Sequence, residues 1–296
     1  MPRKAPDPRP KKAQAQPPYS SGQQSPPGKE KKMAPAADHG EKNYTGNARL
    51  QDKAAIITGG DSGIGRAVAI AFAREGADLV ISFLPEEEDD ARETAKWVEE
   101  AGRKALLIPG DVQKKNYCQR LVETAVRRLG RLDILVNNAA LQRTYDDIGD
   151  IPEEEFASHF RTNVFGTFFL SQAAAEVLPK GGSIINTCSI QAFEPSQNLL
   201  AYAPTKAALV NFTKALAKAL AKKEIRVNGV APGPVWTPLI PSTMPKEKVK
   251  DFGKNTAFER AAQPAELAPI YVFLASQDAT YVTGEIYGAT GGRTPF

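Results

Sequence analysis

Short apolar runs alternate with longer segments in which apolar residues recur at every third or fourth position, from residue 53 almost to the end of the chain. The apolar runs predict buried strands over residues 53–58, 77–83, 104–110, 132–138, 182–189 and 225–233. The periodic segments between them predict helices over residues 64–76, 86–102, 116–130, 153–178 and 201–223. A weaker pattern over residues 280–292 predicts one last strand.

This alternation of strands and helices predicts an α/β fold. Successive right-handed strand–helix–strand crossovers build a doubly wound parallel sheet that helices cover on both faces. We therefore expect a Rossmann-like domain over residues 46–296, in which ligands bind at the carboxyl ends of the strands.

Residues 1–45 have a different composition, rich in Pro, Gln, Lys and Ala and poor in large apolar residues. Such a segment buries too little surface to offset the entropy lost on ordering, so we expect a largely disordered N-terminal extension. Its basic clusters, Lys11–Lys12 and Lys29 to Lys32, suit either a nucleic acid or acidic surface, or a solvated tail. We favour the solvated tail and expect no nucleic-acid partner.

Composition argues against several classes of protein. The two cysteines among 296 residues argue against a disulfide framework and for a reduced, cytoplasmic protein. The two histidines lie far apart in the sequence, so we expect no metal site. No apolar run approaches the length of a membrane span, and no apolar stretch of a secretory signal follows the basic N-terminus, so we expect no membrane association.

A glycine-rich stretch, TGGDSGIG at residues 58–65, joins the first predicted strand to the first predicted helix. A dinucleotide pyrophosphate binds at such a place, against free backbone N–H groups and the positive end of a helix dipole. Gly59 suits a tight turn, Gly63 lets the backbone approach the ligand, and Gly65 permits close packing of helix and strand. The stretch indicates a dinucleotide site because of its place in the fold.

A tyrosine and a lysine, Tyr202 and Lys206, lie four residues apart on a predicted helix and share one face. A lysine ammonium lowers the pKa of a nearby phenol, which can then exchange a proton with a carbonyl or alcohol oxygen. Ser189 follows a predicted strand, where its hydroxyl can bind a substrate oxygen or form a turn. These residue types suit a reaction that moves a hydride and a proton.

The ordered motifs resemble those of the short-chain dehydrogenase/reductase family over residues 50–292. They are TGGDSGIG, NNAA at residues 137–140, Ser189, YAPTK at residues 202–206 and PGPVWT at residues 232–237. The sequence is most similar to the branch of glucose/ribitol dehydrogenase homologues and of general-stress and aldehyde-reductase oxidoreductases. The resemblance implies an NAD(P)-dependent enzyme acting on a sugar, polyol or small alcohol or its carbonyl form. It also implies a homotetramer, which sedimentation at low micromolar concentration tests.

The resemblance assigns roles to single residues. It implies that Asn163, Ser189, Tyr202 and Lys206 are catalytic, with Asn163 holding a water in a proton relay through Lys206. A local kink of the helix is a second reading of Asn163. The cofactor contacts that the resemblance implies are Gly59, Asp61, Ser62, Gly63, Ile64, Gly65, Phe83, Asp111, Val112, Asn138, Ala139, Tyr202, Lys206, Pro232, Gly233, Val235 and Thr237.

Three positions need comment. Asp111 is expected to contact the adenine or to form the N-cap of the next helix. Ala140 stands where the family usually has glycine, which costs little unless the backbone needs a positive φ. Pro204 must lie in the first turn of its helix, so we expect that helix to begin near Leu200 or Ala201.

Residues 236–264 follow the sixth predicted strand, begin with several prolines and show only weak periodicity. A long segment of this kind inside a compact domain is usually a functional loop. We predict a mobile lid that closes over the substrate, and an oligomer contact is the alternative. Gln191, Glu194, Gln197 and Asn198 are candidates for hydrogen bonds to a polyol.

The choice between NAD and NADP depends on residues near the end of the second predicted strand. Ser82, Phe83 and Leu84 supply neither the acidic residue typical of NAD enzymes nor a basic partner for a 2′-phosphate. The acidic run from Glu86 to Glu88 disfavours a phosphate, and Arg66 is expected on a solvated helix face. We expect both cofactors to bind, with a modest preference for NAD.

Two functions from different classes remain open at this stage. The first is an NAD(P)-dependent oxidoreductase. The second is a non-catalytic dinucleotide-binding sensor or scaffold whose basic extension contacts a partner. The complete set of proton-transfer residues favours the enzyme, since a sensor does not need them.

Overall fold

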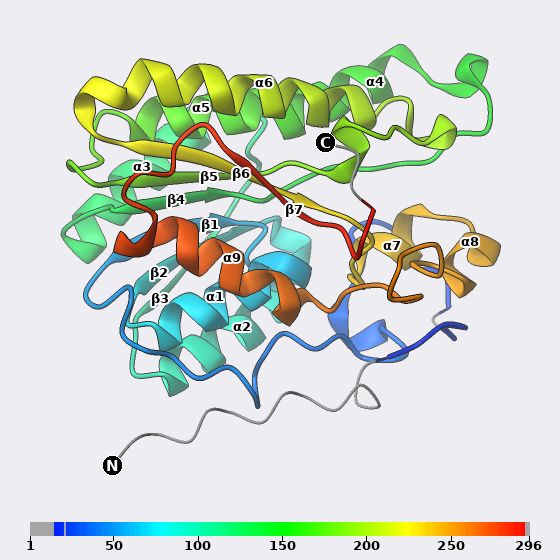
Figure 1. Cartoon of the computed structure of the whole chain (residues 1–296), viewed down its shortest axis with the longest axis horizontal. Coiled ribbons are helices and arrows are strands. Elements are labelled where there is room, and N and C mark those ends of the chain that lie inside the picture. Colours follow the sequence, from blue (N-terminus) through cyan, green and yellow to red (C-terminus); the bar gives the residue numbers. More distant parts are fainter. Residues whose placement is uncertain (1–14, 21, 294–296) are drawn as a thin grey trace.

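The computed structural model describes residues 15–20 and 22–293, and within them the chain forms a seven-stranded parallel sheet in the order β3-β2-β1-β4-β5-β6-β7 (Figure 1). The strands are β1 Ala54–Thr58, β2 Asp78–Phe83, β3 Ala105–Pro109, β4 Ile134–Asn137, β5 Ser183–Thr187, β6 Arg226–Pro232 and β7 Ile286–Ala289. Each predicted strand run contains one of these strands. The predicted doubly wound α/β fold is confirmed.

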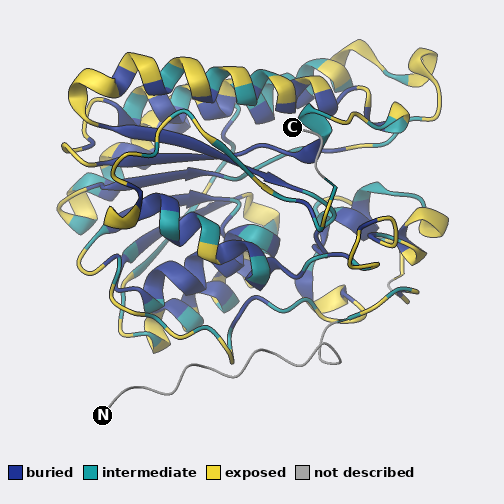
Figure 2. Ribbon diagram, in the orientation of Figure 1, coloured by how far each residue is buried: buried dark blue, intermediate teal, exposed yellow. Residues whose placement is uncertain are grey.

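Helices cover both faces of the sheet (Figure 1). Their bounds are α1 Gly63–Arg74, α2 Glu88–Glu100, α3 Lys115–Leu129, α4 Glu153–Phe160, α5 Gly166–Ala174, α6 Ala203–Leu220, α7 Leu239–Thr243, α8 Lys246–Lys250 and α9 Pro264–Ala275. Helices α1, α2 and α9 pack on one face, and α3, α5 and α6 pack on the other. Alternation along β1 explains the two cores, because Ala55 and Ile57 face α1 and α9 while Ile56 faces α3 and α5. The five inner strands are therefore buried on both faces, whereas the edge strands β3 and β7 are only partly buried (Figure 2).

The single helix predicted over residues 153–178 is divided into α4 and α5 by a π-helical turn, Arg161–Phe165. Asn163 lies at the centre of that turn, so the helix departs from regular α-helical geometry at the residue where a kink was expected. Helix α6 begins at Ala203, slightly later than expected, and Pro204 lies in its first turn as predicted.

The N-terminal extension is packed against the body over its described residues, so the expectation of disorder is wrong for residues 15–20 and 22–45. The Tyr19 ring is buried and stacks on Trp236 with 4.1 Å between ring centroids. Trp236 Nε1 donates a 2.8 Å hydrogen bond to the carbonyl of Pro35. The extension is poor in apolar residues, but Tyr19 and Met33 reach an apolar cluster of the body. Residues 1–14 lie outside the described part of the chain.

Candidate active site

A cavity of about 950 Å³ opens at the carboxyl ends of the strands, where an α/β sheet binds ligands. Its wall includes sixteen of the predicted cofactor contacts: Gly59, Asp61, Ser62, Gly63, Ile64, Phe83, Asp111, Val112, Asn138, Ala139, Tyr202, Lys206, Pro232, Gly233, Val235 and Thr237. Ser189 also lines it, whereas Gly65 and Asn163 do not. Segments from six strand ends therefore meet at one cavity.

The glycine turn after β1 has the backbone shape that requires glycine. Gly59 and Gly63 have φ values of +59° and +50°, in the left-handed region. A Cβ on Gly65 would lie 1.8 Å from the Gly59 carbonyl oxygen, so only glycine fits where α1 approaches the turn. The tight turn and the close helix packing expected of these glycines are found, and phosphate binding at the turn stays a prediction.

The segment after β4 holds the glycine turn in place. Asn138 Nδ2 donates hydrogen bonds of 3.1 Å to the carbonyls of both Thr58 and Gly59. Thr58 Oγ1 accepts hydrogen bonds from the backbone N–H groups of Asn138 and Ala139. Ala140 has no positive φ, so alanine in place of the usual glycine causes no backbone strain there.

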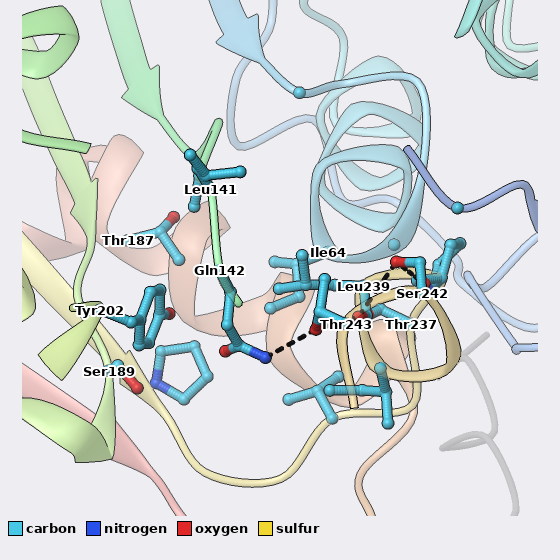
Figure 3. Close-up of a pocket in the computed structure, with 18 of the residues that line it drawn as sticks. Ile64, Leu141, Gln142, Thr187, Ser189, Tyr202, Thr237, Leu239, Ser242 and Thr243 are labelled. Atoms are coloured by element: carbon cyan, nitrogen blue, oxygen red, sulfur yellow. Dashed lines mark hydrogen bonds between the residues drawn. The ribbon is translucent and has the colours of Figure 1, made fainter. Parts of the chain in front are cut away.

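Two hydroxyl groups lie side by side on the cavity wall, from Ser189 after β5 and from Tyr202 before α6 (Figure 3). Ser189 Oγ accepts a 3.1 Å hydrogen bond from the N–H of Gln191, so it also forms a turn. Burial raises the pKa of Tyr202 well above its usual value, and a hydrogen bond with Ser189 opposes that rise. The expected lowering of the tyrosine pKa by lysine is therefore wrong, because desolvation dominates.

Lys206 is buried on the same face of α6 as Tyr202. Its Nζ donates a 2.8 Å hydrogen bond to the Thr187 carbonyl and lies 5.4 Å from the centroid of the Tyr202 ring. Burial lowers the pKa of Lys206 to about 8. An ammonium with this pKa remains mostly protonated at neutral pH.

Asn163 connects three segments behind the cavity. Its side chain accepts a 2.7 Å hydrogen bond from the Leu141 N–H and donates to the Leu141 carbonyl and to Thr205 Oγ1. Its own carbonyl accepts a hydrogen bond from Thr167 Oγ1. In this arrangement Asn163 fixes the segment after β4 against α6.

Asp61 lines the cavity near the end of β2, and Arg66 donates a hydrogen bond to the carbonyl of Asp61. Asp61 is buried, and its Oδ2 has no hydrogen-bond partner among the described residues. Burial, with the charges of Glu87 and Asp90, raises the pKa of Asp61 well above its usual value. An unpartnered buried carboxyl oxygen in this wall suits a hydroxyl donor such as a ribose, so the residues fit a dinucleotide.

Arg66 is buried, and the expectation of a solvated position is wrong. Its guanidinium donates to the carbonyls of Asp61 and Asp90, each at 2.9 Å, and to Thr94 Oγ1. Asp111 lines the cavity, and its Oδ1 accepts from the Gln113 N–H. Because α3 begins only at Lys115, Asp111 caps the preceding turn and does not cap the helix.

The opposite end of the cavity is lined by the segment after β5 and by α7. Of the four polar residues expected there, only Gln191 lines the wall, and its amide group already binds Ser196. Gln142 was not anticipated; its Nε2 donates a 3.0 Å hydrogen bond to Thr243 Oγ1 of α7 (Figure 3). Sequence pattern offered no signal for Gln142, because its contact joins residues far apart in the chain.

Neither a metal-ion site nor a membrane-spanning helix is found in the described part of the chain. No group of His, Cys, Asp and Glu side chains there is arranged to hold a metal ion. None of its helices has the length and apolar character needed to span a bilayer. Cys188, next to Ser189, is a buried thiol whose pKa burial raises to about 11, as expected of a packed side chain.

Comparison with known proteins identifies relatives along nearly the whole chain. The chain is 53% identical over 276 residues to the uncharacterized oxidoreductase YghA of Escherichia coli, covering 93% of this chain and 94% of that protein. It is 45% identical over 275 residues to glucose and ribitol dehydrogenase of Daucus carota, covering 91% and 94%. It is 44% identical over 276 residues to the chloroplastic NADPH-dependent aldehyde reductase 1 of Arabidopsis thaliana, covering 91% and 96%.

Solved structures agree with these relatives. A short-chain dehydrogenase from Burkholderia cenocepacia in complex with NADP has a TM-score of 0.77 and 31% identity, covering 82% of this chain and 98% of that one. A metagenomic blue fluorescent protein in complex with NADPH has the same TM-score, 30% identity and the same coverage. Residues 59–294 match the family model described as enoyl-(acyl carrier protein) reductase. With its glycine turn and its serine, tyrosine and lysine on one cavity, the chain belongs to the short-chain dehydrogenase/reductase family and is an NAD(P)-dependent enzyme.

Proposed function

We propose that the protein interconverts an alcohol and its aldehyde or ketone by hydride transfer, with Tyr202 as the acid/base. One observation carries this proposal: Ser189, Tyr202 and Lys206 line the same cavity as the glycine turn. A dinucleotide on that turn and a substrate at the hydroxyl groups of Ser189 and Tyr202 would therefore lie in the same cavity.

The proposed roles follow from the contacts of each residue. The nicotinamide, when bound, supplies or accepts the hydride. During reduction Tyr202 donates its phenolic proton to the carbonyl oxygen, while Ser189 Oγ donates a hydrogen bond to that oxygen. Lys206, held by the Thr187 carbonyl, places a positive charge beside the phenolate that forms. The family resemblance, and not the contacts of its side chain with Leu141 and Thr205, supports Asn163 as the residue that holds a water in a proton relay through Lys206.

The substrate class that we propose is a sugar, a polyol or a small aldehyde, supported by the similarity to the glucose and ribitol dehydrogenase of carrot and to the aldehyde reductase of Arabidopsis. A panel of these compounds, with NAD(H) and with NADP(H), tests the proposal through absorbance of the reduced nicotinamide. We expect turnover with at least one class. Cofactor binding without turnover on any member would instead favour a non-catalytic sensor or scaffold.

We expect both cofactors to bind, with a modest preference for NAD. Asp61 and Glu87 line the cavity near the end of β2, where a carboxyl group can accept a hydrogen bond from a ribose hydroxyl and offers a 2′-phosphate no cationic partner. The ratio of kcat/KM for the two cofactors, measured at fixed ionic strength, checks this expectation. A preference for NADP above about a hundredfold, roughly 2.7 kcal/mol, would contradict it.

We also propose that residues 236–264, which contain α7 and α8, act as a lid over the substrate. Ile240, Thr243 and Met244 line the cavity, and Gln142 bridges to Thr243 across it. Cofactor and substrate together should slow limited proteolysis within this segment. Equal cleavage rates with and without the ligands would argue for the alternative, an oligomer contact.

A further inference from the structure

The N-terminal extension forms part of the cofactor cavity itself. Pro26, Pro27 and Gly28 line the cavity beside the glycine turn. A Cβ on Gly28 would lie 2.3 Å from the Pro238 carbonyl oxygen, so the extension passes very close to the start of α7. The extension therefore joins the glycine turn to the lid segment.

Glu30 makes the most direct contact between the extension and the turn. Its buried Oε1 accepts a 2.7 Å hydrogen bond from the N–H of Gly63, the first residue of α1. The first N–H groups of a helix have no partner within the helix, so this contact satisfies one of them. Glu30 is absent from the cavity lining, whereas Gly63 is part of it. The carboxylate thus reaches the turn from behind and leaves the cavity side open to a ligand.

A buried histidine balances the charge of Glu30. His39 Nε2 lies 2.8 Å from Glu30 Oε1, and His39 Nδ1 lies 3.0 Å from Glu41 Oε1. Both ring nitrogens face carboxylates, and only the protonated imidazole can donate from both. Burial opposes that charge, but the Glu30 carboxylate and the hydrogen bonds to Glu30 and Glu41 outweigh it and raise the pKa of His39 to about 9.

The other charged groups around this pair come from the helices packed against it. The positive charge of Arg66 in α1 acts to lower the pKa of both Glu30 and His39. For His39 this effect is smaller than the opposite effect of the Glu30 carboxylate. Asp90 of α2 accepts a 3.1 Å hydrogen bond from the Glu30 N–H and forms an ion pair with Arg66. At neutral pH the Glu30–His39 pair is ionised and carries no net charge.

We propose that Glu30 and His39 are positioning residues for the dinucleotide. Glu30 holds the Gly63 N–H and with it the phosphate-binding turn, and His39 cancels a negative charge that would otherwise repel the cofactor phosphates. The proposal rests on cofactor binding by this family member and assigns the extension a role in it.

The dissociation constant of the reduced cofactor, measured by fluorescence titration, tests the proposal. Glu30→Ala should weaken binding by about tenfold, because a hydrogen bond to a charged group is lost. Glu30→Gln keeps an acceptor for the Gly63 N–H and should recover part of that loss. For both variants kcat at saturating cofactor should stay within about twofold, because no reacting group changes. Lys31→Gln is the control, since Lys31 lies on the same extension and its ion pair with Asp89 of α2 is exposed.

The pH profile separates positioning from simple structural support. As pH rises through about 9, His39 loses its proton, Glu30 remains charged, and wild-type cofactor affinity should fall. Glu30→Gln lacks that charge and should show a smaller fall. Lys206 titrates in both proteins, so the comparison removes its contribution.

The outcomes are distinct. A weaker cofactor in Glu30→Ala, partial recovery in Glu30→Gln and the altered pH profile support the proposal. Unchanged affinity in both variants would overturn it, as would tighter binding, which would mean that Glu30 competes with the phosphates. If Glu30→Ala does not fold, the pH profile of Glu30→Gln decides alone. Absence of cofactor binding by the wild-type protein would count against the proposed function instead.

Discussion

Replacement of Tyr202 by phenylalanine should lower kcat by about two to four orders of magnitude, the usual contribution of a positioned general acid. The ring, which is buried beside Lys206, keeps its packing, so the dissociation constant of the cofactor should change by less than about threefold. Steady-state kinetics with the best substrate of the panel, together with a cofactor titration, measure both quantities.

Tyr271→Phe is the matched control. Tyr271 is also a buried tyrosine, its hydroxyl lies 2.9 Å from Thr187 Oγ1, and it does not line the cavity. Its kcat should stay within about threefold of wild type, since the loss is one ordinary hydrogen bond of about 1 kcal/mol. A Tyr202→Phe enzyme as active as this control would remove Tyr202 from the chemistry.

Replacement of Gly65 by alanine should weaken cofactor binding by about ten- to a hundredfold, because forcing a methyl group into a packed site costs about 1–3 kcal/mol. The new Cβ would lie 1.8 Å from the Gly59 carbonyl oxygen and 2.8 Å from Asn138 Nδ2. These are backbone and turn-holding atoms, so relief requires displacement of the glycine turn. A cofactor titration measures the effect.

Gly22→Ala serves as the control for Gly65→Ala. Nothing lies within 4 Å of a Cβ placed on Gly22, so the affinity should not change. A thermal melt of the Gly65 variant shows whether the protein remains folded under the titration conditions. A folded Gly65→Ala protein with wild-type affinity would mean that the turn does not bind the phosphates.

The sheet could be predicted from sequence because its inner strands are buried on both faces and read as continuous apolar runs, whereas the edge strand β7 is only partly buried and gave a weaker pattern. Helix α9 was missed for a related reason: it is apolar on nearly all sides and contains Pro264 and Pro269, so it shows neither periodicity nor the usual composition of a helix. Pro264 lies at its start, where proline is tolerated.

Ser189, Tyr202 and Lys206 could be predicted to share one site, because the serine follows a strand end and the other two lie four residues apart at the start of one helix. Asn163 lies instead in the π-helical turn and does not line the cavity. The features that were missed depend on contacts between distant segments. Arg66 is buried because Asp61 and Thr94 offer acceptors from two other segments. The described part of the extension packs on the body because single residues such as Tyr19 find partners more than two hundred positions away. Local composition carries no information about such partners.

The pKa values of Tyr202 and Lys206 could not be predicted from sequence either. Spacing correctly placed Lys206 beside Tyr202, but the depth of both side chains could not be read from spacing. Burial raises the pKa of Tyr202 and lowers that of Lys206, because it disfavours the charged form of each.

The most direct test of the central claim follows a hydride from the cofactor to the product. Reduced cofactor that carries deuterium at both C4 positions of the nicotinamide is mixed with the wild-type protein and the best carbonyl substrate of the panel, and the product alcohol is analysed by mass spectrometry. The account predicts one deuterium on the carbinol carbon, formed in step with oxidation of the cofactor. Cofactor oxidation without deuterium in the product, or no oxidation with any substrate despite cofactor binding, would contradict it.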